Sequence, residues 1–285
     1  MLSEITPLIL TYNEAPNLDR TLQKLTWARQ VVVLDSFSTD QTETIACRFA
    51  NVAFAKRKFD NHTAQWNFGL EQIKTEWVMS LDADYMLTEE LKSEIGQLAP
   101  DPDVVAYFAR FRYFIAGRPL RASLYPPRAV LFRKSKCRYK QDGHTQTLAI
   151  QGAARFLNGR LWHDDRKPLS RWLESQRSYA ALEAQKLIES RRQPRSVADR
   201  LRTWIWPAAP AAFLYALLVK RCLFDGWPGW YYVLQRTYAE LLLSLELLDH
   251  RLFVKHDPQI SVDAEDGDQA IADLSLQAPK TDNTL

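Results

Sequence analysis

The sequence predicts an α/β fold in which a mainly parallel sheet is covered by helices on both faces. Four apolar runs typical of buried strands lie within the first 85 residues, at 5–12, 31–34, 52–55 and 77–81. Between them lie three stretches with helical spacing of apolar residues, at 16–25, 41–49 and 60–73. Strands that alternate with helices in this way form parallel sheets, because each connection crosses over through a helix.

The polar residues of this region gather where the apolar runs stop. They are Thr11, Asn13 and Glu14 after the first run, Asp35 after the second, and Asp82 and Asp84 after the fourth. In open α/β sheets, ligands bind beyond the carboxyl ends of the strands, at the point where the strand order reverses. The sequence therefore predicts a binding site at this edge.

The pair Asp82 and Asp84 predicts a divalent-cation site. Side chains two positions apart on an extended segment point the same way, and two such carboxylates repel each other unless a cation lies beside them. Their hard oxygens suit Mg²⁺ or Mn²⁺, with phosphate oxygens completing the shell. A Walker loop and a GxGxxG motif are both absent from the sequence, so a metal is the natural partner for phosphate. Alone, the motif is more typical of two surface acids in a loop than of a metal site, and it is the shared sheet edge that favours the metal.

Composition narrows the classes of protein. The 285 residues are 46% hydrophobic and 25% charged, as in ordinary globular proteins, and a net charge of +3 does not indicate nucleic-acid binding. The basic residues concentrate at 155–202, with 12 Lys and Arg against 6 Asp and Glu. Three cysteines lie far apart, and the first residues run into an apolar strand without the basic region or cleavage site typical of a secretion signal. Both features favour a reducing, cytoplasmic location.

Three motifs resemble the signatures of family 2 glycosyltransferases with the GT-A fold. They are Leu8-Ile-Leu-Thr-Tyr-Asn-Glu14, Val33-Leu-Asp-Ser-Phe-Ser-Thr-Asp40 and Leu81-Asp-Ala-Asp84, in the family's order and spacing. Gln65-Trp-Asn67 with Gly69-Leu70 resembles the helix that precedes the family's metal strand. The resemblance covers about residues 4–165, and its nearest subgroup is the lipopolysaccharide-core glucosyltransferases and related envelope-glycan enzymes.

The resemblance implies a role for each motif residue. Thr11, Asn13, Glu14 and Asn67 would belong to the pocket of a nucleotide-sugar donor such as a UDP-sugar, and Asp35 would accept a hydrogen bond from the base. Asp82 would face the ribose and pyrophosphate, and Asp84 would ligate Mg²⁺ or Mn²⁺ together with Asp82. His163, which matches a histidine of the subgroup, would complete the metal shell or contact the diphosphate; alternatively it is structural. The family's usual Asp-Asp after the second strand is Asp35-Ser36 here.

The general base is the open question. An inverting transfer needs a group that takes the proton of the acceptor hydroxyl. Counting back from Gly152, the subgroup's acid falls on Gln146, which cannot accept a proton in this way. Asp142 and His144 lie within four residues and are the alternatives. A third reading makes Asp142-Gly143 a simple turn.

The C-terminal half predicts a helical appendage at 166–256. A helix after Pro168 has one basic face that would screen a diphosphate or an anionic acceptor, or be a solvated surface. The uncharged run 203–219 contains two prolines and is marginally short for a membrane span. Its tryptophans and flanking basic residues favour a position in the membrane interface, with packing against the catalytic domain as the alternative. The acidic stretch 257–285 is predicted to be disordered.

These observations predict three parts: a GT-A catalytic domain at 1–165, the helical appendage at 166–256 and a disordered acidic tail at 257–285. The predicted activity is a metal-assisted, inverting transfer of a hexose from a nucleotide sugar to a lipid-linked or lipopolysaccharide-type acceptor. We expect the protein in the cytoplasm, peripheral on the inner face of the membrane, without nucleic acid as a partner. Two rivals stay open: a nucleotidyltransferase, which would need a Gly-rich basic loop after the first strand, and a nucleotide-sugar-binding scaffold that lacks catalysis because of Gln146.

Overall fold

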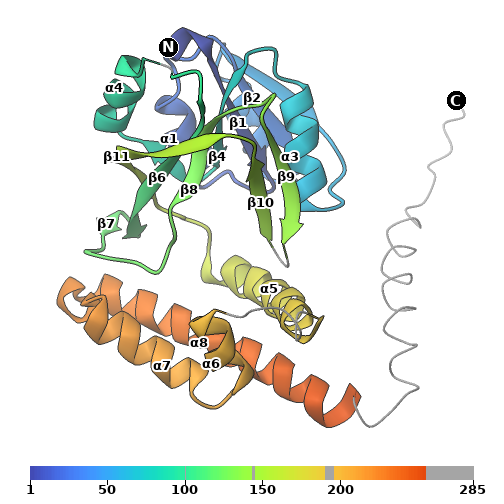
Figure 1. Cartoon of the computed structure of the whole chain (residues 1–285), viewed down its shortest axis with the longest axis vertical. Helices are drawn as coiled ribbons and strands as arrows, with labels where there is room; N and C mark the ends of the chain where they lie inside the picture. The colour runs from blue at the N-terminus through green and yellow to red at the C-terminus, as the bar shows by residue number, and fades with distance from the viewer. Residues whose placement is uncertain (100, 143–144, 190–195, 255–285) are drawn as a thin grey trace, which may run out of the picture.

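The protein consists of a sheet domain and a layer of C-terminal helices packed beside it (Figure 1). The computed structural model describes residues 1–99, 101–142, 145–189 and 196–254. The main sheet has the strand order β3-β2-β1-β4-β8-β6-β11-β5, with β7 paired to β6. A separate two-stranded sheet is formed by β9 and β10.

The N-terminal half of the main sheet is parallel, as predicted. It contains β1 (Ile5–Thr11), β2 (Val31–Asp35), β3 (Val52–Lys56) and β4 (Trp77–Asp82). The strand order reverses at β1, which lies between β2 and β4. Thr11 is opposite Asp35 in the register, and Leu10 is opposite Asp82. The polar residues therefore do reach one edge of the sheet, at its switch point.

Helices cover both faces of this half. One face carries α1 (Leu18–Gln23), α2 (Thr42–Ala46) and α4 (Glu89–Gln97), whose Leu22, Ile45 and Leu91 share an apolar core with the strands. The other face carries α3 (His62–Glu71), which begins where Asn61 Oδ1 accepts a hydrogen bond from the N–H of Ala64. A Cβ on Gly69 of α3 would lie 2.8 Å from two methyl carbons of Leu8, so glycine permits this close packing.

The C-terminal half of the sheet is mixed. Its strands are β5 (Tyr85–Leu87), β6 (Val104–Ile115), β7 (Arg118–Pro119), β8 (Arg128–Arg133) and β11 (Ala153–His163). The apolar runs at 104–115 and 129–133 predict two strands, and both are present as β6 and β8. The parallel pairing of β11 with β6 was not predicted, and it sets His163 opposite Tyr113, while the pairing of β11 with β5 sets His163 opposite Tyr85.

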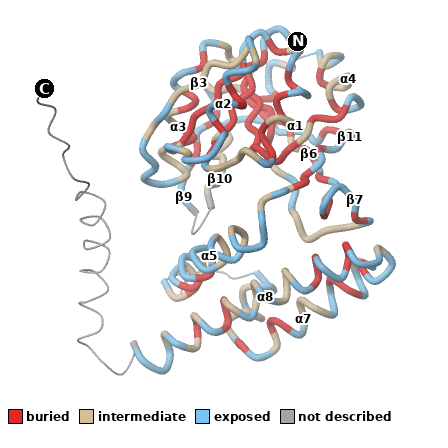
Figure 2. The backbone as a smooth tube through the Cα atoms, turned by 180° about the vertical axis from the view of Figure 1, so that it is seen from behind, coloured by how far each residue is buried: buried red, intermediate tan, exposed pale blue. Residues whose placement is uncertain are grey.

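The helical layer contains two long helices and several short ones. They are α5 (Leu169–Glu189), α6 (Val197–Thr203), α7 (Ala208–Leu214), the π-helical turn η3 (Tyr215–Val219), the 3₁₀ turn η4 (Cys222–Asp225), α8 (Trp227–Asp249) and the turn η5 (His250–Val254). A core of Ala180, Ala184 and Leu187 with Leu243 and Leu247 joins α5 to α8. Figure 2 shows that buried residues concentrate in the sheet domain, whereas along α8 buried residues alternate with intermediate and exposed ones.

One expectation for this layer needs correction. The leucine-rich residues 233–253 predict a helix, and the helix observed there begins earlier, at Trp227, because Pro228 occupies its first turn, where a missing N–H is tolerated. The run 203–219, in which two prolines were expected to interrupt a helix, is divided between the end of α6, a turn, α7 and η3. Among the described helices, none has the combination of length and apolarity that crossing a membrane requires. The predicted tail at 257–285 lies outside the described residues.

Candidate active site

Asp35 organises the loop that follows β2. Its carboxylate is fully buried and accepts three hydrogen bonds, from Thr11 Oγ1 at 2.8 Å, from the N–H of Ser38 at 2.7 Å and from Ser38 Oγ at 2.5 Å. These donors satisfy the charge without a ligand. The structure thus brings Thr11 and Asp35 together as expected, in a role that shapes the turn. Contact of Asp35 with a nucleotide base stays a prediction.

Asn13 connects the loop after β1 to the loop after β2 through hydrogen bonds. It adopts a left-handed conformation with φ of 54°, which asparagine tolerates better than most residues. Its Oδ1 accepts a hydrogen bond from the N–H of Thr39 at 2.8 Å, and its own N–H donates to Ser38 Oγ at 2.8 Å. The next residue, Glu14, donates its N–H to Thr42 Oγ1 at 2.8 Å. The two loops therefore form one bonded unit.

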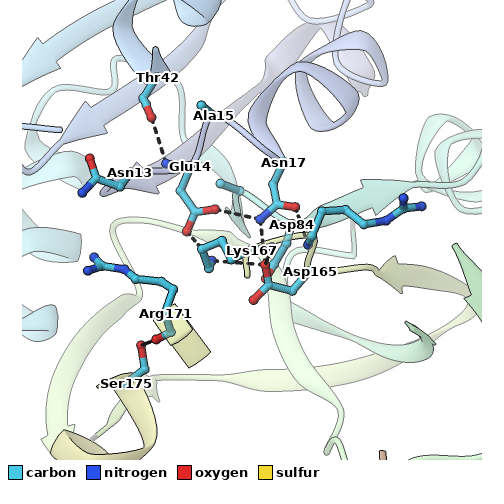
Figure 3. Close-up of polar contacts among 12 residues, drawn as sticks. Asn13, Glu14, Ala15, Asn17, Thr42, Asp84, Asp165, Lys167, Arg171 and Ser175 are labelled. Atoms are coloured by element: carbon cyan, nitrogen blue, oxygen red, sulfur yellow. Dashed lines mark hydrogen bonds and ion pairs between the residues drawn. The ribbon is translucent and has the colours of Figure 1, made fainter. Parts of the chain in front are cut away.

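Glu14 turns toward the end of the sheet domain and meets Lys167 (Figure 3). Lys167 Nζ lies 2.6 Å from Glu14 Oε1, and Asn17 Nδ2 donates to Glu14 Oε2 at 2.9 Å. Burial raises the pKa of Glu14 to about 7, although Lys167 opposes the shift. Burial also opposes the charge of Lys167, but nearby Asp84 and Glu14 raise its pKa overall.

The segment after β11 is held by a second set of charges. Asp164 is buried, and its Oδ2 lies 2.9 Å from Arg20 Nη1 and 2.7 Å from Arg166 Nη2. Its Oδ1 accepts the N–H of Gly117 at 3.2 Å. A carboxylate with two guanidinium partners is neutralised well enough to be buried. This anchor fixes the position of Lys167 relative to α1.

Asp84 and His163 form a buried pair at the end of β4. His163 Nε2 lies 3.3 Å from Asp84 Oδ2. Burial would raise the pKa of Asp84, but the charge and hydrogen bond of His163 outweigh it and lower the pKa to about 2. Burial lowers the pKa of His163, and Asp84 outweighs that effect and raises it. Asp84 Oδ1 and His163 Nδ1 are both buried and have no hydrogen-bond partner among the described residues.

Three tyrosines enclose this pair. The His163 ring centroid lies 4.5 Å from that of Tyr113, 4.7 Å from Tyr125 and 5.2 Å from Tyr85. The hydroxyl groups of Tyr85 and Tyr125 hydrogen-bond to each other. Such a wall excludes water from one side of the pair, which strengthens electrostatic interactions within it.

The residues at this position fit a divalent cation bound through a substrate. Asp84 has an ionised carboxylate with one unpaired oxygen, and Asp82 lies half-buried two positions before it. In the described part of the chain, no three histidine, cysteine or acidic side chains are gathered as a complete metal shell. Mg²⁺ is typically held by one or two carboxylates together with phosphate oxygens, and this donor set matches that pattern. The predicted ligands Asp82, Asp84 and His163 are therefore compatible with a cation, and their role as ligands stays a prediction.

Asn67 lies away from the loops after β1 and β2. Its amide pairs with the backbone of Tyr139 in β9 (Cys137–Asp142): Nδ2 donates to the carbonyl oxygen, and Oδ1 accepts the N–H, both at 3.0 Å. Both ends of the amide are thus used to attach the β9–β10 hairpin to α3. A direct role of Asn67 in donor binding stays a prediction that these hydrogen bonds do not support.

The candidate bases lie on this hairpin. Asp142 ends β9, opposite Thr145 at the start of β10 (Thr145–Ile150), and its side chain is not described. His144 lies outside the described residues. Gln146 is half-buried on β10, opposite Gln141. Residues 143 and 144 lie outside the described residues, so the reading of Asp142-Gly143 as a turn and the choice between the two bases stay predictions.

Asn17, Arg20 and the three tyrosines were not predicted as parts of the site. Asn17 is buried and bridges Glu14 to Asp165, donating at 2.9 Å to both. A single asparagine before a helix reads as a cap, and nothing local indicates partners about 150 positions away. The tyrosines read as ordinary strand residues. The parallel pairing of β11 with β6 brings Tyr113 to His163, and the antiparallel pairing of β11 with β5 brings Tyr85 there.

Comparison with known proteins defines the class. Residues 8–159, more than half of the chain, match the profile of Glycosyl transferase family 2. The chain therefore belongs to glycosyl transferase family 2 and is a glycosyltransferase.

Individual relatives are distant. The chain is 24% identical over 205 residues to the lipopolysaccharide core biosynthesis glycosyltransferase LpsC of Rhizobium meliloti, covering 67% of this chain and 74% of the relative. It is 22% identical over 259 residues to an uncharacterized glycosyltransferase of Rickettsia bellii, covering 86% of both. The structure of a mannosyltransferase from Pyrobaculum calidifontis, solved with GDP-mannose and Mn²⁺, superposes with a TM-score of 0.51 at 18% identity, covering 88% of each chain. This similarity confirms the GT-A fold.

Proposed function

We propose that the protein transfers a hexose from a nucleotide-diphosphate sugar with inversion, assisted by a divalent cation at Asp84. The observation that carries this proposal is the unpaired oxygen of ionised Asp84, located where Thr11, Glu14 and Asp82 also arrive. A cation held there would act as a Lewis acid for the departing diphosphate. The mannosyltransferase of similar fold was solved with GDP-mannose and Mn²⁺, which supports this choice.

The chain's own residues would position the donor. The bonded loops after β1 and β2 form the nucleotide side of the site, with Glu14 held by Lys167 at its end. The ammonium group of Lys167 adds positive charge close to the predicted diphosphate position, where charge develops during the reaction. His163, packed among tyrosines, holds Asp84 in one orientation.

The acceptor would lose its proton to a group on the β9–β10 hairpin. Asp142 is the first candidate and His144 the second, because a glutamine at 146 cannot take a proton. The attacking oxygen then forms its bond to the anomeric carbon as the bond to the diphosphate breaks. We propose a lipopolysaccharide-type or other lipid-linked acceptor, in line with the name of the Rhizobium relative.

A lipid-linked acceptor agrees with the exposed aromatic surface of the helical layer. We define the apolar belt as Trp204, Trp206, Leu218, Val219 and Phe224, all more than half exposed. Basic residues accompany neighbouring rings: Lys220 Nζ lies 5.6 Å from the Tyr215 ring, and Arg121 Cζ 5.8 Å from the Phe224 ring. Aromatic groups beside cations suit the headgroup region of an anionic bilayer. We therefore propose peripheral binding to the inner face of the cytoplasmic membrane.

The test is a screen of nucleotide sugars by thermal shift with Mn²⁺, followed by a transfer assay on envelope lipid extracts. A donor that binds the folded protein raises its melting temperature. The proposal expects one nucleotide sugar to stabilise the protein and to be turned over. Donor binding without turnover on any extract would instead favour the scaffold without catalysis. No stabilisation by any nucleotide sugar would contradict the proposal.

A further inference from the structure

A cavity of about 330 Å³ lies between the sheet domain and the helical layer. Its walls come from the end of β6, the segment 165–167, the start of α5 and the first three turns of α8. They include Tyr113, Asp165, Lys167, Trp172, Trp227 and Tyr231. Its volume falls within the range of about 300–1,000 Å³ that is usual for sites of small ligands.

The cavity adjoins the candidate active site through two of its walls. The ring of Tyr113 lines the cavity and also packs 4.5 Å from the ring of His163, the partner of Asp84. Lys167 lines it as well, and its Nζ contacts Glu14 at 2.6 Å. A group bound in the cavity would therefore contact Tyr113 and Lys167, each of which contacts a residue of the candidate active site.

Strand order places the cavity opposite the nucleotide side of the site. The loops that the proposed function assigns to the nucleotide follow β1 and β2, and the proposed cation position follows β4. The cavity is at the end of β6 and at the segment that follows β11, and both strands lie on the other side of β4 in the order β2-β1-β4-β8-β6-β11. A donor laid from β2 to β4 would present its sugar toward this side, which is where an acceptor must approach.

The lining suits a sugar ring. Trp172, Trp227 and Tyr231 offer flat apolar surfaces for the C–H face of a pyranose. Gln235 supplies an amide for hydroxyl groups. Asp165 Oδ1 is taken by Asn17 Nδ2 and by the N–H of Lys167, both at 2.9 Å, whereas Oδ2 has no hydrogen-bond partner among the described residues. That oxygen is available to accept a bond from a hydroxyl.

We propose that this cavity binds a sugar ring of the acceptor glycan. The inference rests on the proposed function and assigns acceptor recognition to α5 and α8, outside the residues that match the family profile. Trp227 and Tyr231 are also partly exposed, so this part of the cavity wall reaches the protein surface.

The test uses three variants of the full chain and one matched control. Trp172→Leu and Tyr231→Leu remove aromatic walls, and Gln235→Trp fills the cavity. The control is Trp230→Leu, which changes a partly exposed tryptophan of the same helix that does not line the cavity. The acceptor probe is deacylated lipopolysaccharide core oligosaccharide, which does not need the membrane. Thermal shift with donor and Mn²⁺ shows that each variant is folded.

We expect each cavity variant to raise the KM for the oligosaccharide about tenfold or more, the effect of losing one well-packed aromatic contact. The KM for the donor and the donor-dependent thermal shift stay unchanged, and the control behaves as wild type. Saturation-transfer NMR should show the oligosaccharide bound to wild type and not to Gln235→Trp.

Three results would overturn the inference. A rise in donor KM alone would assign the cavity to the donor sugar. If the KM for the oligosaccharide is unchanged in all three variants, the cavity is only a feature of the packing. If saturation-transfer NMR shows no binding of the oligosaccharide to wild type, the cavity does not bind an acceptor glycan. Failure of the proposed function is seen separately, as the absence of any donor-dependent thermal shift. Because the NMR measurement needs no turnover, it tests the cavity in that case too.

Discussion

Lys167 Nζ lies 2.6 Å from Glu14 Oε1 and thereby joins the loop after the first strand to the segment that follows the last strand. The two residues are 153 positions apart. Both side chains are largely buried, so the contact is protected from solvent screening. The nucleotide side of the site therefore depends on the folding of the whole sheet domain.

Loss of the Lys167 ammonium group should destabilise the protein. Lys167→Met leaves the carboxylate of Glu14 buried without its cation, and breaking such a pair costs about 3–5 kcal/mol. Urea denaturation at pH 8 should show this loss in the free energy of unfolding. Lys74→Met, at an exposed position, is the control and should change stability little. If Lys167→Met and Lys74→Met have the same free energy of unfolding, the ion pair between Glu14 and Lys167 does not contribute to stability.

The free energy of unfolding should fall as the pH rises from about 4.5 to about 7. Burial raises the pKa of Glu14 from 4.5 to about 7, so in this window the folded state holds a proton that the unfolded state releases. This contribution is fully present below the unfolded pKa and is lost as the pH passes the folded pKa, with a slope of at most about 1.4 kcal/mol per pH unit. Denaturation curves of wild type and Glu14→Gln should differ in this slope. Parallel curves would argue against a shifted Glu14.

One cysteine should react with a thiol reagent in the native protein. Cys47 is exposed, whereas Cys137 and Cys222 are buried, and burial raises the pKa of each of these two thiols to about 11. Thiolates are the reactive species, so buried thiols with raised pKa values react slowly. Titration with an aromatic disulfide at pH 8 should give one rapid thiol per chain and all three in denaturant. Cys47→Ser should abolish the rapid phase; a remaining rapid thiol would contradict the packing around Cys137 or Cys222.

The apolar belt should bind anionic vesicles. Trp206 is 79% exposed and Phe224 63%, and Trp206→Ser with Phe224→Ser should weaken binding to phosphatidylglycerol vesicles about tenfold or more, since each buried aromatic contributes about 1.5–3 kcal/mol. Co-sedimentation measures the effect, and high salt should reduce binding of wild type. Phe156→Ser removes an aromatic of similar exposure, 55%, from the sheet domain and is the control. If Phe156→Ser weakens vesicle binding as much as the double variant does, the apolar belt is not the surface that contacts the membrane.

The sequence predicts best what local spacing determines. The strands of the parallel half could be found because each is a short apolar run followed by turn residues, and buried strands of parallel sheets read in this way. The start of α8 was missed because Gly226-Trp-Pro-Gly reads as a turn, although proline is tolerated in a first helical turn.

The residues of the candidate site also fall into those that local spacing identifies and those that only the tertiary fold brings together. Asp82 and Asp84 were identifiable because both follow one strand, and the register confirms that Asp82 reaches the same edge as Thr11 and Asp35. The partners of Asp164 were not identifiable, since Arg20 meets it across 144 positions only after β11 has paired with β6. Pairings of this kind depend on the tertiary fold, and one sequence carries no local signal for them.

The most direct test of the cation at Asp84 is calorimetric titration of UDP into the protein with and without Mn²⁺. The account predicts that Mn²⁺ strengthens nucleotide binding about tenfold or more in wild type, because phosphate oxygens and Asp84 share the cation. Asp84→Asn should lose this gain while staying folded, and Asp103→Asn, an exposed acid elsewhere, should keep it. Nucleotide binding that responds equally to Mn²⁺ in wild type and Asp84→Asn would contradict the account.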